Sequence, residues 1–189
     1  MNYLISTIET LTEKDIEYIK VNYPARYEKA SHLPKEEQFK TCILAYVLLI
    51  RLIGEFNEVN VYYNENKKPY IKGKPYFNIS HSGNFVAVVA DDKEVGIDIQ
   101  KINEDNLKLM KFFNKKDQEY IKETESVNRF FEIWSKKEAA IKLLGTGLTT
   151  PLKDVEILDE TTIKVDNMVI KNRYKLLADG YSLCICYQE

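Results

Sequence analysis

The stretch FNISHSGNFVAVVADDKEVGIDIQ, residues 77–100, decides the fold of this chain. Phe77–Ser80 and Phe85–Ala90 read as strands, and the polar residues 81–84 separate them. An acidic turn then leads into Val95–Ile99, where apolar residues alternate with glycine and aspartate. This pattern predicts short antiparallel strands joined by tight turns.

The alternation places Asp98 and Gln100 on one strand face, because successive side chains of a strand point to opposite sides. His81 follows the first strand at the entrance to its turn, and too few apolar residues come after it for a buried core histidine. Loops held by rigid strands often carry functional side chains. We therefore expect His81 to be available as a donor to a phosphate group.

Two long helices are predicted outside this stretch. Residues 34–53 begin with a proline and continue with apolar side chains at helical spacing. Residues 127–144 carry Glu138 and Lys142 four positions apart, and two glycines follow directly after the segment. Glu138 and Lys142 are therefore expected on one side of a single helix.

Shorter elements complete the prediction. Helical patterns occupy residues 106–112 and 116–122, a β-rich stretch occupies residues 59–63, and several antiparallel strands are expected between residues 155 and 187. Each half of the chain thus combines one long helix with a small antiparallel sheet, which is an α+β arrangement.

We place the boundary between the two halves at the acidic turn. The N-terminal half covers residues 1–94 and the C-terminal half covers residues 95–189. Because no flexible linker lies there, a packed seam is expected between the halves.

Composition excludes several classes of protein. The chain has 189 residues, 44% of them hydrophobic, and a formal net charge of −2, which gives no reason to expect a nucleic-acid partner. Its longest apolar run, Cys42–Ile50, is too short to cross a bilayer, and the N-terminus lacks a signal-peptide pattern. We expect a cytoplasmic protein without membrane contact, in which all three cysteines are reduced. The glycine patterns of the commonest nucleotide-binding loops and the nucleophile elbow of a serine hydrolase do not occur.

Asp98 on its strand and Glu138 on the later helix could converge on one divalent cation. Magnesium prefers oxygen ligands and keeps waters or substrate phosphates in its shell, so two protein carboxylates suffice. The alternative is an exposed glutamate and a turn aspartate without a common role. It stays open at this point, because the chain has 29 acidic residues.

Lysines surround Glu138 on the same helix. Lys136, Lys137 and Lys142 could place positive charge near the phosphate oxygens of a diphosphate ligand. An ordinary charged helix face is the alternative interpretation. Trp134 is expected to be a core aromatic that fixes the helix.

Three segments together resemble the 4′-phosphopantetheinyl transferase superfamily, surfactin type. They are Phe77–Ser82, Val95–Ile99 and Trp134–Ala139, which stand in the family's order and at suitable separations. Lys67–Tyr70 is a looser match to the family's Gly-Lys-Pro element, with lysine in place of the glycine. The resemblance covers about residues 35–147 and implies two similar α+β halves related by a pseudo-twofold axis. Coenzyme A would lie in the cleft between them and Mg²⁺ on the second half.

The resemblance also assigns site residues by motif. Asp98 and Glu138 would bind magnesium, and Glu138, Lys142 and His81 would be the catalytic residues, with Glu138 as the general base. The residues expected to meet coenzyme A are Lys40, Thr41, Lys68, Ser80, His81, Lys137 and Lys142. Of these, Lys40 and Thr41 would lie near the adenosine 3′-phosphate, and Lys74 is a rival to Lys68.

Gln100 departs from the pattern of many relatives, which carry a glutamate two residues after the strand aspartate. A neutral amide is a weaker magnesium ligand than a carboxylate, so Gln100 is expected to contribute weakly or through a water. The basic contacts around Arg26 and Lys29 cannot be assigned from the sequence.

The implied reaction moves the phosphopantetheine arm of coenzyme A to a serine of an apo acyl or peptidyl carrier protein. It releases adenosine 3′,5′-bisphosphate. Residues 107–121 combine apolar side chains with lysines and are our candidate for carrier docking. We expect a monomer, and the pathway, whether antibiotic or fatty acid biosynthesis, stays open. The alternatives are a noncatalytic module that binds coenzyme A or a carrier protein, and a magnesium-dependent phosphohydrolase.

Overall fold

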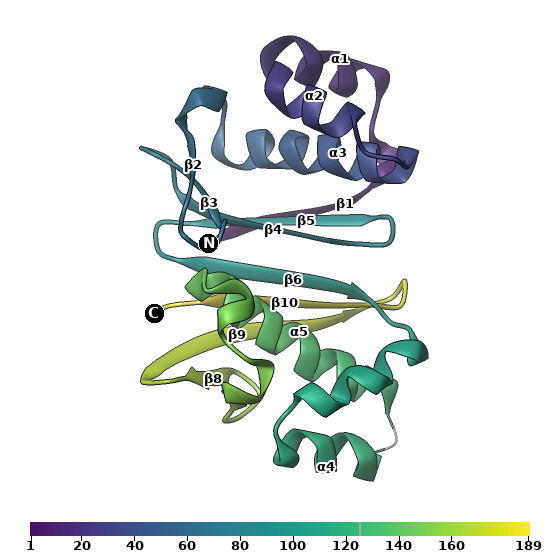
Figure 1. Cartoon of the computed structure of the whole chain (residues 1–189), viewed down its shortest axis with the longest axis vertical. Coiled ribbons are helices and arrows are strands. Elements are labelled where there is room, and N and C mark those ends of the chain that lie inside the picture. Colours follow the sequence, from purple (N-terminus) through teal and green to yellow (C-terminus); the bar gives the residue numbers. More distant parts are fainter. Residues whose placement is uncertain (125) are drawn as a thin grey trace.

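Two antiparallel sheets lie face to face, and one long helix covers the outer side of each (Figure 1). The computed structural model describes residues 1–124 and 126–189. The first sheet has the order β1-β5-β4 and consists of β1 (Asn2–Thr7), β4 (Tyr76–Ser82) and β5 (Phe85–Asp91). The second has the order β6-β10-β9-β8-β7 and consists of β6 (Val95–Lys101), β7 (Val155–Ile157), β8 (Thr162–Val165), β9 (Met168–Leu177) and β10 (Tyr181–Tyr187). A separate hairpin pairs β2 (Val61–Tyr63) with β3 (Pro69–Ile71).

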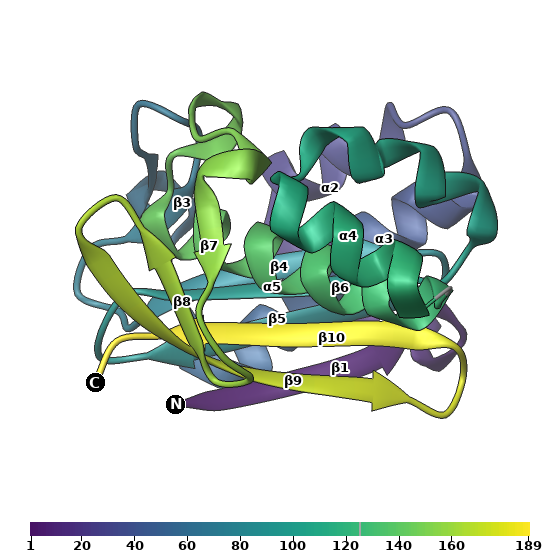
Figure 2. The same cartoon turned by 90° about the horizontal axis from the view of Figure 1, so that it is seen from below.

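The helices occupy the two ends of the long axis of the molecule (Figure 1). The N-terminal set is α1 (Glu13–Asn22), α2 (Pro24–Ser31) and α3 (Glu36–Ile53), and the C-terminal set is α4 (Lys115–Thr124) and α5 (Val127–Leu144). Within residues 1–124 and 126–189, five 3₁₀ segments connect the elements: η1 (Ile8–Thr10), η2 (Glu58–Asn60), η3 (Glu104–Phe112), η4 (Gly147–Thr149) and η5 (Leu152–Asp154). Helix α5 packs against β6 and β10 of the second sheet, and α4 packs against α5 (Figure 2). Among the described residues, no helix is long and apolar enough to cross a membrane.

Strand β5 contributes to two hydrophobic cores, because its successive side chains point to opposite faces of the sheet. Val86, Val88 and Ala90 point toward α3 and join the core of the first half. Ala87 and Val89 point the other way and pack against apolar side chains of β6 and β10. A strand with apolar residues on both faces therefore lies at the centre of the molecule.

The two sheets are tied together by side chains of β4. Its alternate polar residues accept hydrogen bonds from alternate backbone N–H groups of β6, at 3.0 Å for Asn78 with Ile97, 3.1 Å for Ser80 with Ile99 and 3.0 Å for Ser82 with Lys101. The opposite edge of β6 pairs with β10. Buried N–H groups need partners, so these side chains satisfy the edge of β6 that would otherwise be open.

The α+β prediction is confirmed, and both long helices form almost over the predicted ranges. The first hairpin differs, because His81 pairs with Val86 and Ser82 pairs with Phe85. His81 therefore lies in a strand, and the turn shrinks to two residues. The segment predicted as a helix at 106–112 is the 3₁₀ segment η3, and no prediction covered β1, α1 and α2.

Candidate functional site

The close approach of α5 to β6 assembles the site. A Cβ atom added to Gly96 would lie 2.1 Å from the carbonyl oxygen of Ala139 and 2.4 Å from the backbone nitrogen of Leu143. Only glycine leaves room for a helix backbone this near a strand. The contact brings Glu138 and Lys142 of α5 beside Asp98, which lies two residues after Gly96 on β6.

Asp98 is the centre of this cluster and is fully buried. Its Oδ1 accepts hydrogen bonds from Lys142 Nζ at 2.6 Å, Ser80 Oγ at 3.2 Å and Gln100 Nε2 at 3.2 Å. Its Oδ2 is also buried and has no hydrogen-bond partner among the described residues. An unsatisfied carboxylate oxygen in the interior is costly, so Oδ2 marks a position where a cation fits.

Glu138 supplies the second carboxylate. Its pKa is raised, first by burial and then by the negative charge of Asp98, while Lys142 acts in the opposite direction. A buried carboxylate and a half-buried one that repel each other are stabilised by a shared cation, and oxygen ligands suit magnesium. The described residues hold no cluster of three or more histidine, cysteine or acidic side chains around such a position. The chain therefore offers magnesium two carboxylates.

Gln100 was expected to be a weak ligand or to act through a water. Its amide nitrogen instead donates to Asp98 Oδ1 at 3.2 Å. Gln100 thus orients the carboxylate of Asp98.

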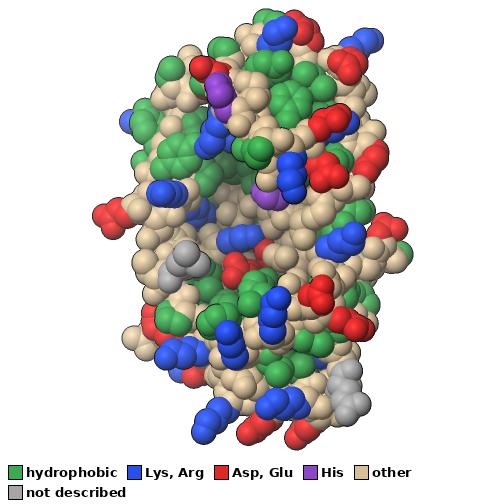
Figure 3. Space-filling model, turned by 45° about the vertical axis from the view of Figure 1, so that its right-hand side comes forward, with side chains coloured by type: hydrophobic (Ala, Val, Ile, Leu, Met, Phe, Trp, Pro, Cys, Tyr) green, Lys and Arg blue, Asp and Glu red, His purple; other side chains and the backbone are tan. Residues whose placement is uncertain are grey.

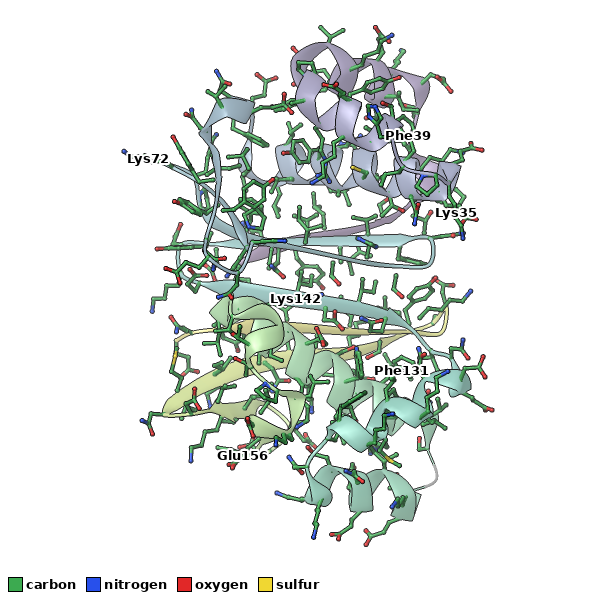
Figure 4. All side chains as sticks on the ribbon, viewed as in Figure 1. Lys35, Phe39, Lys72, Phe131, Lys142 and Glu156 are labelled. Atoms are coloured by element: carbon green, nitrogen blue, oxygen red, sulfur yellow. The ribbon has the colours of Figure 1, made fainter. Side chains whose placement is uncertain are left out.

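Lys142 lies where the sequence predicted it, among the carboxylates. Figure 4 shows its side chain at the end of α5 that faces the two sheets. Its ammonium group donates to Asp98 Oδ1 and, at 2.9 Å, to Ser80 Oγ. Ser80 is itself buried and bonded on three sides, to Lys142, Asp98 and the N–H of Ile99. The Ser80 hydroxyl thus holds the cluster together across the seam.

The structure does not bring Lys137 to this site, contrary to the diphosphate contact expected from the motif. Its side chain is fully buried on another face of α5, where the ammonium pairs with Asp117 at 2.7 Å and donates to the carbonyl oxygens of Leu152 and Val155. Lys136 is also buried, in an ion pair of 2.8 Å with Glu132. A helix shows its side chains all round, so residues next to Glu138 in sequence point away from it.

Trp134 is a core aromatic, as predicted. Its ring lies 5.8 Å from that of Phe130 and 6.1 Å from that of Phe113, measured between centroids.

Lys68 and its rival Lys74 also differ from expectation, because each bonds the C-terminal end of a helix. Lys68 Nζ pairs with Glu94 and donates to the carbonyl oxygen of Leu143 at 2.8 Å. Lys74 Nζ donates to the carbonyl oxygen of Ile53 at 3.1 Å. Both ammonium groups stabilise the negative end of a helix dipole and are engaged there rather than at an anion site.

A cavity of about 700 Å³ opens beside this cluster, between α2, α3 and strands β2 to β4. Part of its wall is apolar and includes Leu49, Ile71 and Phe77. The basic side chains at this cavity are Arg26, Lys29 and Lys35. Figure 3 shows a hollow in the middle of one face with lysine, arginine and histidine side chains around it. The cavity therefore combines apolar surface with positive charge.

Of the pair predicted for the adenosine 3′-phosphate, Thr41 lines this cavity. Lys40 is not part of the lining, and its ammonium pairs with Glu36 at 2.7 Å. The cavity is lined by the basic side chains of Arg26, Lys29 and Lys35 and not by that of Lys40. The sequence signal for two of them was basic residues three positions apart after a proline at a helix start, a pattern too common to stand out.

His81 lines the cavity as well, and it follows Ser80 on β4. Neighbouring residues of a strand face opposite sides, so β4 presents Ser80 to the carboxylate cluster and His81 to the cavity. The surrounding protein keeps enough water away to lower the pKa of His81, and the positive charges of Lys142 and Arg26 lower that pKa further. His81 is therefore neutral at physiological pH and can donate one hydrogen bond.

Comparisons with known proteins agree with this arrangement. The family model described as "4'-phosphopantetheinyl transferase superfamily" matches residues 94–186. The chain is 34% identical over 110 residues to the 4′-phosphopantetheinyl transferase gsp of Aneurinibacillus migulanus, covering 55% of this chain and 46% of that protein. It is 30% identical over 156 residues to the 4′-phosphopantetheinyl transferase Sfp of Bacillus subtilis strain 168, covering 77% of this chain and 70% of that protein.

A further relative is the 4′-phosphopantetheinyl transferase psf-1 of Bacillus pumilus, 39% identical over 90 residues that cover 44% of this chain and 39% of that protein. The chain spans about half the length of two of the curated relatives, 46% of gsp and 53% of another 4′-phosphopantetheinyl transferase of Bacillus subtilis. The match to residues 94–186 includes Asp98, Glu138 and Lys142, and the alignment with the Bacillus subtilis protein covers most of both chains. The chain therefore belongs to the 4′-phosphopantetheinyl transferase superfamily.

Proposed function

We propose that this chain transfers the phosphopantetheine arm of coenzyme A to a serine of an apo acyl or peptidyl carrier protein. The observation that carries the proposal is the buried Oδ2 of Asp98, which has no hydrogen-bond partner among the described residues and lies beside Glu138 and Lys142. Strand β4 separates this cluster from a cavity with basic side chains. The names of the relatives support the same reaction.

Coenzyme A would enter through the cavity. Arg26, Lys29 and Lys35 would meet its phosphates, with Thr41 and His81 as neutral donors, and the apolar wall would cover the adenine ring. Arg26 is preorganised for this role, because its guanidinium stacks on Tyr46 at 4.4 Å from the ring centroid. The diphosphate would then extend along β4 toward the carboxylates.

Magnesium would be held by Asp98 Oδ2 and Glu138, and when bound it supplies positive charge to the diphosphate oxygens. Lys142 would add a second positive charge to the same oxygens. The carrier serine hydroxyl attacks the β-phosphorus, its proton passes to Glu138, and the bond from that phosphorus to the bridging oxygen breaks. Adenosine 3′,5′-bisphosphate leaves with the bridging oxygen.

The carrier protein would dock on η3 and α4. The surface there combines half-exposed aromatic rings with lysines, since Phe112 is 50% and Tyr120 41% exposed. Lys111 lies 5.2 Å from the Phe112 ring centroid. Apolar contacts within a basic rim would suit an acidic carrier helix. The proposal includes a cytoplasmic monomer with neither nucleic acid nor membrane as a partner.

A noncatalytic module that binds coenzyme A is the second candidate. Gln100 favours it. Many relatives carry a glutamate at this position, whereas the Gln100 amide donates to Asp98, so a metal ion would meet two carboxylates in place of three. The free Oδ2 of Asp98 and the site position of Lys142 favour catalysis.

Intact mass measurement of an apo carrier protein separates the two candidates. Incubation with this protein, coenzyme A and magnesium should add about 340 Da, the mass of a phosphopantetheine group. A chelator should prevent the gain, and Asp98→Asn and Glu138→Gln should lower the rate at least about 100-fold. Glu156→Gln serves as the control, because Glu156 is exposed on β7, away from the cluster (Figure 4). Coenzyme A binding without any mass gain, tested on carriers from several pathways, would leave the noncatalytic module.

A further inference from the structure

The loop between β2 and β3, residues 64–68, reaches from the N-terminal half to the end of α5. Asn64 Nδ2 donates to the carbonyl oxygen of Gly145 at 2.9 Å, and Lys68 Nζ donates to that of Leu143 at 2.8 Å. The last carbonyl groups of a helix have no partner within the helix. Two side chains from a distant part of the sequence therefore cap α5.

Asn64 does this while it also shapes its own loop. Its Oδ1 accepts from the backbone nitrogens of Asn66 at 3.0 Å and Lys68 at 2.8 Å. The oxygen of the amide holds the loop, and its nitrogen holds the helix. The fit is close, since a Cβ atom on Gly145 would lie 2.7 Å from Asn64 Nδ2.

The helix end that Asn64 caps belongs to the candidate active site. Lys142 directly precedes Leu143, and its ammonium lies 2.6 Å from Asp98 Oδ1. The loop is equally close to the cavity, because Tyr63 and Pro69 flank it and line that cavity. One short hairpin therefore contacts both the proposed coenzyme pocket and the last turn of α5.

We propose that Asn64 is a positioning residue, which with Lys68 fixes the last turn of α5 and so sets Lys142 against Asp98. This inference deepens the proposed function and rests on it. Asn64 touches neither the carboxylates nor, by its place outside the cavity lining, the coenzyme. Its loss should change how fast bound substrates react and leave the binding of coenzyme A unchanged.

Asn64→Asp is the sharpest test. Aspartate has the same shape and keeps the acceptor oxygen for the loop, but it removes the donor and places a negative charge against the Gly145 carbonyl. Asn64→Ala is the second variant, because it removes both functions. Asn66→Ala is the matched control from the same loop, since no side-chain hydrogen bond of Asn66 occurs within the described residues.

Hydrogen exchange by mass spectrometry on the full chain gives a readout independent of the reaction. Amide exchange in the peptide that carries Lys142 should be about tenfold faster in Asn64→Asp than in the wild type, because the cap is lost. Asn66→Ala should exchange like the wild type. In the transfer assay, kcat should fall about tenfold in Asn64→Asp while KM for coenzyme A stays within about twofold.

The inference would be overturned if Asn64→Asp had the same amide exchange rate and the same kcat as the wild type. It would also be overturned if Asn66→Ala lost as much kcat as Asn64→Asp. A raised KM with unchanged kcat would overturn it as well, because Asn64 would then act in binding. If the wild-type chain transfers nothing, the proposed function fails, and the exchange comparison alone decides whether Asn64 fixes the helix end.

Discussion

Replacing Gly96 by alanine should damage both the stability and the activity of this protein. The added Cβ would lie 2.1 Å from the Ala139 carbonyl oxygen, 2.4 Å from the Leu143 nitrogen and 2.9 Å from the Leu143 Cα. All three neighbours are backbone atoms of α5, so no side chain can rotate away. The strand and the helix must separate by about 1 Å to restore ordinary contact distances.

The cost follows from that separation. Overpacking of a core lowers the free energy of unfolding by up to about 3 kcal/mol. The atoms that the new Cβ meets are backbone atoms of α5, which cannot rotate away, so we expect the loss to be close to that maximum. For a chain of this length, such a loss lowers Tm by about 6–12 °C. Asp98 and Glu138 sit on the two elements that separate, and a displacement of about 1 Å lowers a rate about 100-fold. Thermal unfolding followed by the mass assay, run well below Tm, measures both effects.

Gly180→Ala is the control. Gly180 has a φ of +73°, and nothing lies within 4 Å of an added Cβ, so the change costs about 1 kcal/mol of backbone strain and leaves the site intact. Tm should fall modestly and the transfer rate should stay at the wild-type value. The reasoning is refuted if Gly96→Ala unfolds within about 2 °C of the wild type, or if it reacts at the rate of the Gly180→Ala variant.

Three further outcomes are expected. Lys67 has a φ of +67°, so Lys67→Gly should raise Tm by about 1–3 °C in a thermal scan, and a decrease would contradict the strain argument. The lowered pKa of His81 means that the unfolded chain binds more protons just below the ordinary histidine pKa of about 6.5, so the free energy of unfolding should fall as pH falls through that value. His81→Gln should flatten this dependence in denaturant titrations between about pH 5 and 7. Lys142→Met should bind magnesium more tightly in calorimetry without coenzyme. In the wild type the Lys142 ammonium lies 2.6 Å from Asp98 Oδ1 and neutralises the carboxylate that would bind the cation. Weaker binding by the variant would show that Lys142 instead orients this carboxylate.

Strand β4 has two functions, because its two faces contact different parts of the molecule. Its odd-numbered residues Phe77, Ile79 and His81 line the cavity, and its even-numbered residues Ser80 and Asn78 bind β6. The sequence showed the alternation, but it did not show what would lie on either side. Asn78 lies within the strand predicted at Phe77–Ser80, and only the structure shows that its side chain satisfies a buried N–H of the other sheet.

Local patterns determined the two long helices and the central strands, and the family motifs marked the pair of carboxylates. Residues 36–53 and 127–144 form helices because their apolar spacing and end signals are properties of neighbouring residues. The motifs around Asp98, Glu138 and Lys142 could be recognised because their order and separation are also linear features. Gly96 belonged to one of those motifs, and its packing role became visible only with α5 in place.

Tertiary structure alone decided which charges face the site. Lys137 adjoins Glu138 in sequence, yet the helical turn directs it into a buried ion pair with Asp117. Lys68 and Lys40 matched the family's pattern, but their ammonium groups are engaged by Glu94 and by Glu36. A lysine side chain is long and rotates freely, so its position depends on carboxylates and carbonyl groups that arrive from distant segments. Sequence therefore determined the family and the residues of the carboxylate cluster, whereas packing between the two halves decided which basic residues line the pocket and which loop caps α5.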